Sequence, residues 1–461
     1  MIPFVAGMID RAIAWRTGRR WPEYLAQYRV MERWPRERLD AWRWERLQAL
    51  LHHAVETVPY WREEFRRLGA EPQDFTSPDH LRLLPPLTKD VINLRGPDMY
   101  SNAPHRGRTT QTSTGGSTGR NVWLVIDGET HDRRRAAGRL SEEWDGVVPG
   151  RRMVTFWGAS LDAHPSRGAQ WYDRVMSRVF LSAYGVGEQE LLGYFDRLAR
   201  FRPEVITSYP SILLHAARRA GKDRCRKVGA RLIYCSAEAL YPPVREELED
   251  LFGAKVRNRY ASREFGLIAS DCPHGAGLHV ADMRLWIESG TPGADGPSEL
   301  LITDLDNAPM PLIRYRIEDM GQFEAAPCPC GRTLSRLKSI DGRVLDVITT
   351  PDGRAFGGTF FTLVFRPFDK SIRQFQVVQD RADHLLIKIV PGDLFDGPRR
   401  RKLELVLRDQ LGADMTIDLQ EVVSIPPLPS GKRRFVVSEI AAPAADPASS
   451  TAPAGGTPAG S

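Results

Sequence analysis

The sequence has few cysteines and no long apolar run. Only five of its 461 residues are cysteine, which excludes a small disulfide scaffold and indicates a reducing compartment, where thiols bind metal more often than they pair. No segment reaches the roughly 18 to 20 apolar residues of a membrane-spanning helix. The first residues, MIPFVAGMIDRAIAW, lack a basic start and a small-residue cleavage site, so no secretory signal is expected. We therefore predict a cytoplasmic protein with no membrane partner.

Neither sign of charge dominates the sequence. The 64 Lys and Arg residues exceed the 58 Asp and Glu residues by only six, a mild excess that does not require a nucleic-acid partner. Residues 1–70 contain six of the eleven tryptophans among many arginines. Such a mixture can bind nucleic acid, but amphipathic helices with aromatic anchors on a larger body are the favoured interpretation. We expect no nucleic-acid partner.

The pattern of apolar segments predicts a large α/β domain followed by a small α+β domain. Between residues 105 and 320, strand-like runs such as MVTFW and RLIYCS alternate with helical stretches. After residue 346 the pattern becomes strand-rich, and the last residues are almost entirely Ala, Pro, Gly, Ser and Thr. The expected divisions are a helical segment packed on the large domain (1–100), the large domain (101–342), a small mobile domain (346–440) and a disordered tail (441–461).

A run of glycines and hydroxyl residues precedes the strand-like sequence NVWLVI. Glycines let backbone N–H groups point at one anion, and nearby hydroxyls add donors, so the run suits a polyphosphate. It lacks the Gly-Lys-Ser/Thr ending of a Walker loop and precedes a strand rather than a helix, so a flexible Ser/Gly turn is the alternative. The residues are Thr114, Gly115, Gly116, Ser117, Thr118 and Gly119.

Three further segments carry candidate binding residues near strand ends. Tyr260 could stack on a purine, Glu264 could reach a metal bound to phosphates, and Asp319 could accept both hydroxyls of a ribose. Glu238 follows another apolar strand. Ordinary strand-end loops and a solvated strand are the alternatives for all four.

The junction between the two predicted domains and a later loop supply two more candidates. Gly342, Arg343 and Asp346 lie where the composition changes, so they are candidates for a hinge. Lys432 lies in the loop Pro-Ser-Gly-Lys-Arg-Arg, and only nine of the 64 basic residues are lysine. A loop lysine is a flexible point charge suited to a phosphate or a carboxylate.

The order of these segments resembles the adenylate-forming superfamily, and within it the phenylacetate-CoA ligase-like branch with its capsular-polysaccharide ligase relatives. The resemblance covers residues 100–440, and its phrases are TGGSTG (114–119), SYPSILL (208–214), YASREFG (260–266), MPLIRYRIEDMG (310–321), CPCGRT (328–333), IDGRVLD (340–346) and PSGKRR (429–434). It implies an AMP-forming acid-thiol ligase with a large nucleotide- and acyl-binding domain and a small domain that swings on a hinge.

The resemblance also implies a role for each candidate residue. A carboxylic acid would react with ATP to form an acyl-adenylate and pyrophosphate, and the acyl group would pass to coenzyme A, or to an amine or another carrier in the alternative version. Thr114 to Gly119 would hold the β- and γ-phosphates, Glu238 and Tyr260 would line the adenine, and Glu264 would hold magnesium. Asp319 would bind the ribose, Arg343 would lie near the ribose and phosphates, and Lys432 would bridge the acyl carboxylate and the α-phosphate. The hinge stays open between Leu345 and Asp346.

A cluster of thiols and histidines predicts a structural zinc site. Three thiolates and one imidazole suffice for a tetrahedral zinc, and several members of the resembled branch carry one there; free thiols are the alternative. The expected ligands are Cys272, His279, Cys328 and Cys330, with His274 as the rival to His279. Cys225 is expected at the surface and Cys235 in the core. The acid, which we expect to be aryl or compact and apolar, and the acceptor are the predicted partners, with a homodimer as the candidate assembly.

Overall fold

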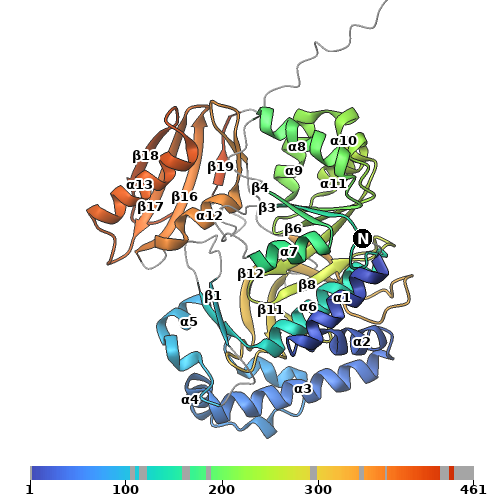
Figure 1. Ribbon diagram of the computed structural model, residues 1–461. Helices are drawn as coiled ribbons and strands as arrows, with labels where there is room; N and C mark the ends of the chain where they lie inside the picture. The colour runs from blue at the N-terminus through green and yellow to red at the C-terminus, as the bar shows by residue number, and fades with distance from the viewer. Residues whose placement is uncertain are drawn as a thin grey trace, which may run out of the picture.

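The computed structural model describes residues 3–103, 109–113, 122–157, 167–182, 188–290, 298–341, 347–368, 371–425 and 436–440. Over these residues the chain forms a large α/β part, coloured blue to yellow, and a smaller α+β part in orange and red (Figure 1). Their order along the chain agrees with the predicted fold class. The candidate hinge, 342–346, lies outside the described residues.

Helices form the first hundred residues and pack along one side of the large part (Figure 1). Trp61 is fully buried, and its indole N–H donates to the backbone oxygen of Pro311 at 3.1 Å. Within the described residues, no helix combines the length and the apolar character needed to cross a membrane. The elements are α1 (Pro3–Arg16), α2 (Trp21–Met31), α3 (Arg36–Thr57), α4 (Pro59–Leu68), η1 (Pro72–Asp74), η2 (Pro78–Leu83), α5 (Lys89–Arg95) and η3 (Gly96–Met99).

The large part is built on one mixed sheet, which has eleven strands among the described residues, in the order β10-β11-β12-β13-β9-β8-β7-β6-β5-β3-β4. Neighbouring strands pair in parallel in one half of the sheet, β4-β3-β5-β6-β7. They pair antiparallel in the other half, β7-β8-β9-β13-β12-β11-β10. The strands are β3 (Met153–Trp157), β4 (Arg178–Ser182), β5 (Val205–Ser208), β6 (Leu232–Ser236), β7 (Lys255–Ser262), β8 (Gly266–Asp271), β9 (Leu278–Val280), β10 (Leu285–Ser289), β11 (Ser298–Asp304), β12 (Tyr315–Glu324) and β13 (Arg336–Asp341).

Helices between the parallel strands cover the sheet, as expected where βα units bury both faces of a parallel sheet. Side chains of α8, α9 and α11 pack with those of β3, β5 and β6 in one apolar core. Asp127 caps α6 by accepting the backbone N–H of Thr130 at 2.8 Å. The helices are α6 (Gly128–Trp144), α7 (Arg167–Val175), α8 (Glu188–Phe201), α9 (Pro210–Ala220), α10 (Lys222–Val228) and α11 (Pro242–Phe252).

Two short hairpins flank this body. The first pairs β1 (Thr110–Ser113) with β2 (Trp123–Ile126), and Ser113 lies opposite Trp123. The glycine-rich segment 114–119 therefore connects two paired strands, although it is itself outside the described residues. The second pairs β14 (Val347–Thr349) with β15 (Ala355–Gly357), and β15 lies against α9.

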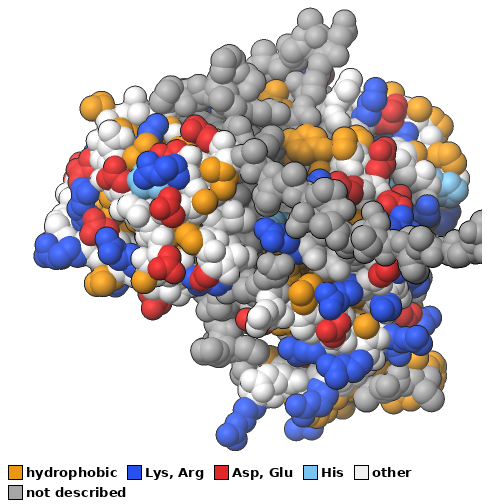
Figure 2. Space-filling model, turned by 90° about the horizontal axis from the view of Figure 1, so that it is seen from above, with side chains coloured by type: hydrophobic (Ala, Val, Ile, Leu, Met, Phe, Trp, Pro, Cys, Tyr) orange, Lys and Arg blue, Asp and Glu red, His pale blue; other side chains and the backbone are white. Residues whose placement is uncertain are grey.

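The smaller part has its own sheet, ordered β18-β17-β16-β19 over the described residues, with helices packed on it. Viewed from above, it forms a separate lobe whose surface mixes acidic and basic side chains (Figure 2). Its elements are α12 (Gly358–Phe365), η4 (Arg366–Phe368), β16 (Ile372–Arg381), β17 (His384–Pro391), α13 (Gly397–Leu411), β18 (Thr416–Glu421) and β19 (Val436–Ser438).

Candidate functional site

The carboxyl ends of the parallel strands gather several of the predicted residues. Ligands of open α/β sheets bind outside this edge. Trp157 ends β3 and Tyr209 follows β5, and their rings stack with centroids 3.9 Å apart. Glu238 follows β6, and its Oε2 accepts the backbone N–H of Ser211, in the first turn of α9, at 3.1 Å. The edge therefore carries an aromatic pair and a carboxylate held at a helix N-terminus.

Tyr260 and Asp319 are brought together from distant strands. The Tyr260 hydroxyl donates to Oδ2 of Asp319 at 2.8 Å, although three strands separate β7 from β12 in the strand order. The sheet must therefore curl so that β12 approaches the end of β7. Asp319 was predicted at the end of a strand, and that position is wrong: it lies inside β12, at a shift of register against β11 where Glu318 has φ +69°. A bulge re-aims side chains in this way.

Glu264 lies in the turn between β7 and β8 and is 7% exposed. Its Oε1 accepts the hydroxyl of the buried Tyr315 at 3.1 Å. Its backbone oxygen accepts Nη2 of Arg134, which also pairs with Asp304 at 3.1 Å. The turn is thus held from α6, β11 and β12, so the carboxylate has a fixed position.

A buried ion cluster supports this turn. Arg284 is fully buried, and it pairs with Asp304 and Asp306 at 3.3 Å each. Its Nη1 donates to the backbone oxygen of Phe265, next to Glu264, at 2.9 Å. Burial raises the pKa of Asp306, with Arg284 opposing that shift.

We expect Arg284→Met to lower the free energy of unfolding by about 3 kcal/mol, because it leaves buried carboxylates short of a cation. Urea unfolding would measure the change. Arg218→Met is the matched control: Arg218 pairs with Glu247 at 2.6 Å, but their side chains are 55% and 37% exposed, so the expected loss is below about 1 kcal/mol. Equal losses in the two variants would contradict this assignment.

Two residues near the site were missed in the sequence. Lys89, at the start of α5, is 6% exposed, and its Nζ lies 2.8 Å from Oε2 of Glu318, the neighbour of Asp319. The scarcity of lysine was an available signal. No signal in the sequence distinguishes Arg134, because it lies in the run Arg133 to Arg135. Only the fold shows which of these arginines reaches the turn that carries Glu264.

Several predicted residues lie outside the described residues, so the structure places neither them nor their contacts. They are Thr114, Gly115, Gly116, Ser117, Thr118, Gly119, Arg343, Leu345, Asp346 and Lys432.

Two turns of the same shape bring the predicted metal ligands together. The backbone N–H of Gly275 donates to the oxygen of Cys272 at 2.9 Å, and that of Gly331 donates to the oxygen of Cys328 at 3.1 Å. Both glycines have positive φ, +65° and +75°, a conformation that L side chains adopt at a cost. Each turn presents a buried thiol toward the other.

The four ligand atoms of Cys272, His279, Cys328 and Cys330 all lie within 4.8 Å of one another. The sulfurs of Cys272 and Cys328 are 3.7 Å apart, and Sγ of Cys330 is 3.3 Å from Nε2 of His279. Zn–S bonds of about 2.3 Å in a tetrahedron separate two sulfurs by roughly 3.8 Å, whereas a disulfide needs about 2.05 Å. The spacing fits a zinc ion, and His274 is exposed and outside this group.

The surroundings of the cluster influence its protonation. Burial, with the positive charge of Arg332 and Arg336, lowers the pKa of His279 to about 4, so the imidazole is neutral and able to ligate near pH 7. Burial raises the pKa of the Cys272 thiol to about 12, so a metal would have to displace its proton.

Contacts beside the cluster tie it to the helices. The Trp144 ring lies edge-on to His279 with centroids 5.6 Å apart. Glu32, just after α2, accepts both Nε1 of Trp144 at 2.7 Å and Nε of Arg332 at 3.0 Å. A metal here would therefore stabilise the packing of α2 and α6 on the sheet.

The two remaining cysteines lie in the core. Cys235 is buried as predicted, but the expected surface position of Cys225 is wrong, because this residue is 0% exposed. Its thiol faces the backbone oxygen of Ala217 at 3.6 Å, on the side where α10 packs against α9. The arginines and lysines around it in the sequence suggested an exposed face that the α9–α10 contact covers.

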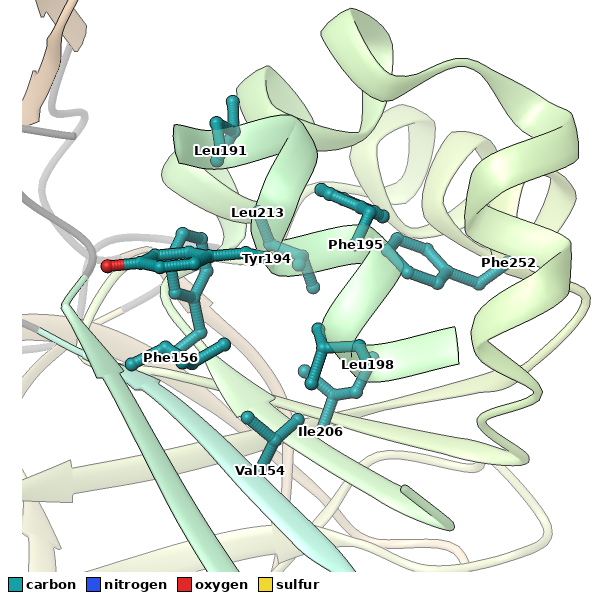
Figure 3. Close-up of a pocket in the computed structure, with 10 residues that line it drawn as sticks. Val154, Phe156, Leu191, Tyr194, Phe195, Leu198, Ile206, Leu213 and Phe252 are labelled. Atoms are coloured by element: carbon teal, nitrogen blue, oxygen red, sulfur yellow. The ribbon is translucent and has the colours of Figure 1, made fainter. Parts of the chain in front are cut away.

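An apolar cavity of about 20 Å³ lies between β3 and helices α8, α9 and α11 (Figure 3). Phe156, Tyr194, Leu213 and Phe252 are among its lining residues. Phe156 lines the cavity, and Trp157, the next residue of β3, packs against the same apolar core through Tyr209. The space suffices for about one water molecule. It is therefore a packing gap and is too small to be the binding site of a carboxylic acid substrate.

Comparisons with known proteins place these features in a wider context. Residues 348–439 match the family model of the CapK C-terminal domain. The chain is 23% identical over 370 residues to Protein CapK of Staphylococcus aureus, covering 78% of this chain and 81% of that protein. It is 26% identical over 373 residues to phenylacetate-coenzyme A ligase of Escherichia coli, covering 76% and 81%.

A solved structure shares the fold. The crystal structure of 2-hydroxyisobutyryl-CoA ligase, in complex with 2-HIB-AMP and CoA in the thioesterification state, matches with a TM-score of 0.60 at 19% identity. The match covers 89% of this chain and 92% of that one. The predicted architecture, a large α/β part with a smaller α+β part, is therefore confirmed.

Proposed function

We propose, on the premise that the chain is an adenylate-forming protein of the phenylacetate-CoA ligase-like branch, that it activates a carboxylic acid with ATP. The acid and ATP would give an acyl-adenylate, and the acyl group would then pass to coenzyme A. The relatives named CapK and phenylacetate-coenzyme A ligase and the matching C-terminal family model confirm this branch, which the motifs alone had indicated. The relatives named phenylacetate-coenzyme A ligase also support the prediction of an AMP-forming acid–CoA ligase.

The hydrogen bond between Tyr260 and Asp319 is the observation that carries the proposal. It brings a ring that can lie against a purine next to a carboxylate that can accept two ribose hydroxyls, at the edge of the sheet where nucleotides bind. Glu264 lies in the turn that follows β7, the strand that carries Tyr260. Two motifs that are separate in the sequence, 260–266 and 310–321, thus meet at one place, as a nucleotide site requires.

We assign the reaction steps to residues of this chain. An oxygen of the substrate carboxylate attacks the α-phosphorus of ATP, the P–O bond to the β-phosphate breaks, and pyrophosphate leaves. In this assignment Thr114 to Gly119 would hold the leaving phosphates, Lys432 would bridge the carboxylate and the α-phosphate, and Arg343 would lie near the ribose and phosphates. Glu238 and Tyr260 line the adenine, and Asp319 binds the ribose. Positive groups placed where charge develops lower such a barrier.

Glu264 is the proposed magnesium ligand. Magnesium is usually held by one or two carboxylates together with substrate phosphates and water, and Glu264 offers one carboxylate whose position is fixed by Tyr315. The ion would neutralise charge on the triphosphate. The zinc site of Cys272, His279, Cys328 and Cys330 is proposed as structural, because four protein ligands leave no open position for chemistry.

The small domain is proposed to move between the two steps. Residues 346–440 would turn relative to 101–342 about the hinge at Leu345 or Asp346, which removes Lys432 and admits the thiol. The helical segment 1–100 would stay on the large domain, and 441–461 would be a tail. A cytoplasmic location and a homodimer stay predictions.

The acid is proposed to be aryl or compact and apolar. Trp157 and Tyr209 stack at the carboxyl edge of the parallel strands, and we propose that they line the acyl pocket. Flat rings can pack against a flat substrate, which supports an aryl acid.

A panel of carboxylic acids tests the proposal. Mixing the protein with ATP, magnesium and each acid should release pyrophosphate with a subset of acids, and adding coenzyme A should give a thioester by mass spectrometry. An amide formed from a supplied amine, with no thioester, would favour the amide version. No pyrophosphate over a broad panel would contradict adenylation itself.

We expect Tyr260→Phe to raise the KM for ATP by about tenfold, because Asp319 loses a hydrogen bond to its charged form, while the KM for the acid stays unchanged. Tyr194→Phe is the control, since its hydroxyl also donates to a carboxylate, Oε1 of Glu190 at 3.0 Å, but within α8. If Tyr260→Phe changed the KM for ATP and the KM for the acid equally, the placement of Tyr260 at the nucleotide would be contradicted. The same would follow if Tyr194→Phe raised the KM for ATP as much as Tyr260→Phe does.

A further inference from the structure

Helix α1 buries its small residues and exposes its large ones. Ala6, Asp10 and Ala14, spaced four residues apart, face the protein. Large apolar side chains project to the surface instead, with these exposed fractions: Phe4 73%, Val5 36%, Met8 49% and Trp15 84%. An ordinary surface helix turns its apolar face to the core, so this face needs a partner outside the described chain.

The orientation of α1 is fixed by its buried face. Asp10 is 2% exposed, and its Oδ1 accepts both Nη2 of Arg135 and the hydroxyl of Tyr172 at 2.7 Å. Ala6 packs against Gly150, where an added Cβ would come within 2.5 Å of the Ala6 Cβ. Turning Phe4 and Trp15 inward would unpair a buried carboxylate and place large groups where there is no room.

The exposed face is also basic. Arg11 and Arg16 are exposed on α1, and its one acidic residue is the buried Asp10. Helix α7 lies beside α1 (Figure 1) through the contact of Tyr172 with Asp10. It adds Trp171, which is 53% exposed, and two exposed arginines, Arg167 and Arg174.

We propose that α1 is a membrane-surface helix that docks on a bilayer containing anionic lipids. Apolar side chains next to arginines fit the boundary between acyl chains and negative head groups. A second copy of this chain fits less well, because an isologous contact through this face would bring arginines of both copies together. The proposal goes beyond the proposed function and revises the expectation of no membrane partner.

The dimensions of the helix agree with binding in the plane of the surface. From Phe4 to Trp15 the helix rises about 16 Å at 1.5 Å per residue, about half of a bilayer core of roughly 30 Å. Tryptophan favours the head-group level, and the arginine side chains can extend to the phosphates.

Vesicle flotation with the full chain tests the proposal. We expect binding to phosphatidylcholine vesicles that contain phosphatidylglycerol, much weaker binding to pure phosphatidylcholine, and weakening by high salt. The variant Phe4→Ser/Met8→Ser/Trp15→Ser should bind at least about tenfold more weakly. Arg11→Glu/Arg16→Glu should also lose more than about tenfold.

A matched control distinguishes binding through α1 from nonspecific adsorption of exposed apolar side chains to vesicles. Leu405 and Val423, 68% and 97% exposed, lie on the small domain, and Leu405→Ser/Val423→Ser should bind vesicles as the unchanged chain does. Absence of binding, equal binding to both kinds of vesicle, or equal loss in the control would overturn the proposal. A dimer that the α1 variant abolishes, with no vesicle binding, would assign the face to a second copy and overturn it as well.

Discussion

Replacing Lys432 with alanine is expected to slow pyrophosphate release by about 10²- to 10³-fold while the chain stays folded. In the proposed adenylation step two anions, the acid carboxylate and the triphosphate, approach each other. A positioned ammonium at the developing charge lowers that barrier, and removing one such charge has an effect of this size. Arg433 and Arg434 follow Lys432, but the planar guanidinium does not replace a compact ammonium at one point.

A second measurement distinguishes a role in adenylation from a general defect. If the small domain carries Lys432 away before thioester formation, then Lys432→Ala should convert a supplied acyl-adenylate and coenzyme A to thioester at the unchanged rate. Lys402→Ala, an exposed lysine on α13 of the same domain, should leave both steps unchanged. Equal slowing of both steps by Lys432→Ala would contradict the proposed assignment, as would no slowing at all.

Part of the parallel half of the large sheet could be predicted closely because strands such as β3 and β6 are short, largely apolar runs. MVTFW became β3 at the same residues, 153–157, and RLIYCS (231–236) became β6, Leu232–Ser236. Such strands are buried on both faces, so their hydrophobicity is visible without knowing their neighbours.

Most of the antiparallel half could not be predicted in this way. Strand β9 has three residues, and β12 contains charged side chains within a shifted register. Their pairing depends on contacts between residues far apart in the chain, such as Leu278 with Leu337. For the same reason the prediction that Asp319 lies at the end of a strand was wrong, although the residue itself was identified.

The choice between His274 and His279 illustrates the same limit. Both lie at plausible spacing from Cys272, and nothing local distinguishes them. His279 lies on β9 directly opposite Arg336 of β13, which brings it to the turn that holds Cys328 and Cys330. The deciding information is the register between two strands more than fifty residues apart.

Removing the metal is expected to lower the melting temperature by about 5 °C or more, because a ligand that binds only the folded state stabilises it. Three thiols and an imidazole are packed within 4.8 Å of one another, and without an ion they lose the bonds that hold the two turns together. Since Glu32 and Trp144 connect this cluster to α2 and α6, the loss should spread to the packing of the helices. A chelator and a melting curve measure it, together with metal analysis that finds one zinc per chain.

Two cysteine variants separate metal loss from damage to the core. Cys272→Ser removes one ligand, so zinc content should fall and the chelator should lower the melting temperature no further. Cys235→Ala removes a buried thiol outside the cluster, so this variant should keep its zinc and its full response to the chelator. A chain without zinc whose melting curve is insensitive to the chelator would contradict the metal site. In that case the 3.7 Å between the sulfurs of Cys272 and Cys328 would have to be explained by two protonated thiols packed in contact.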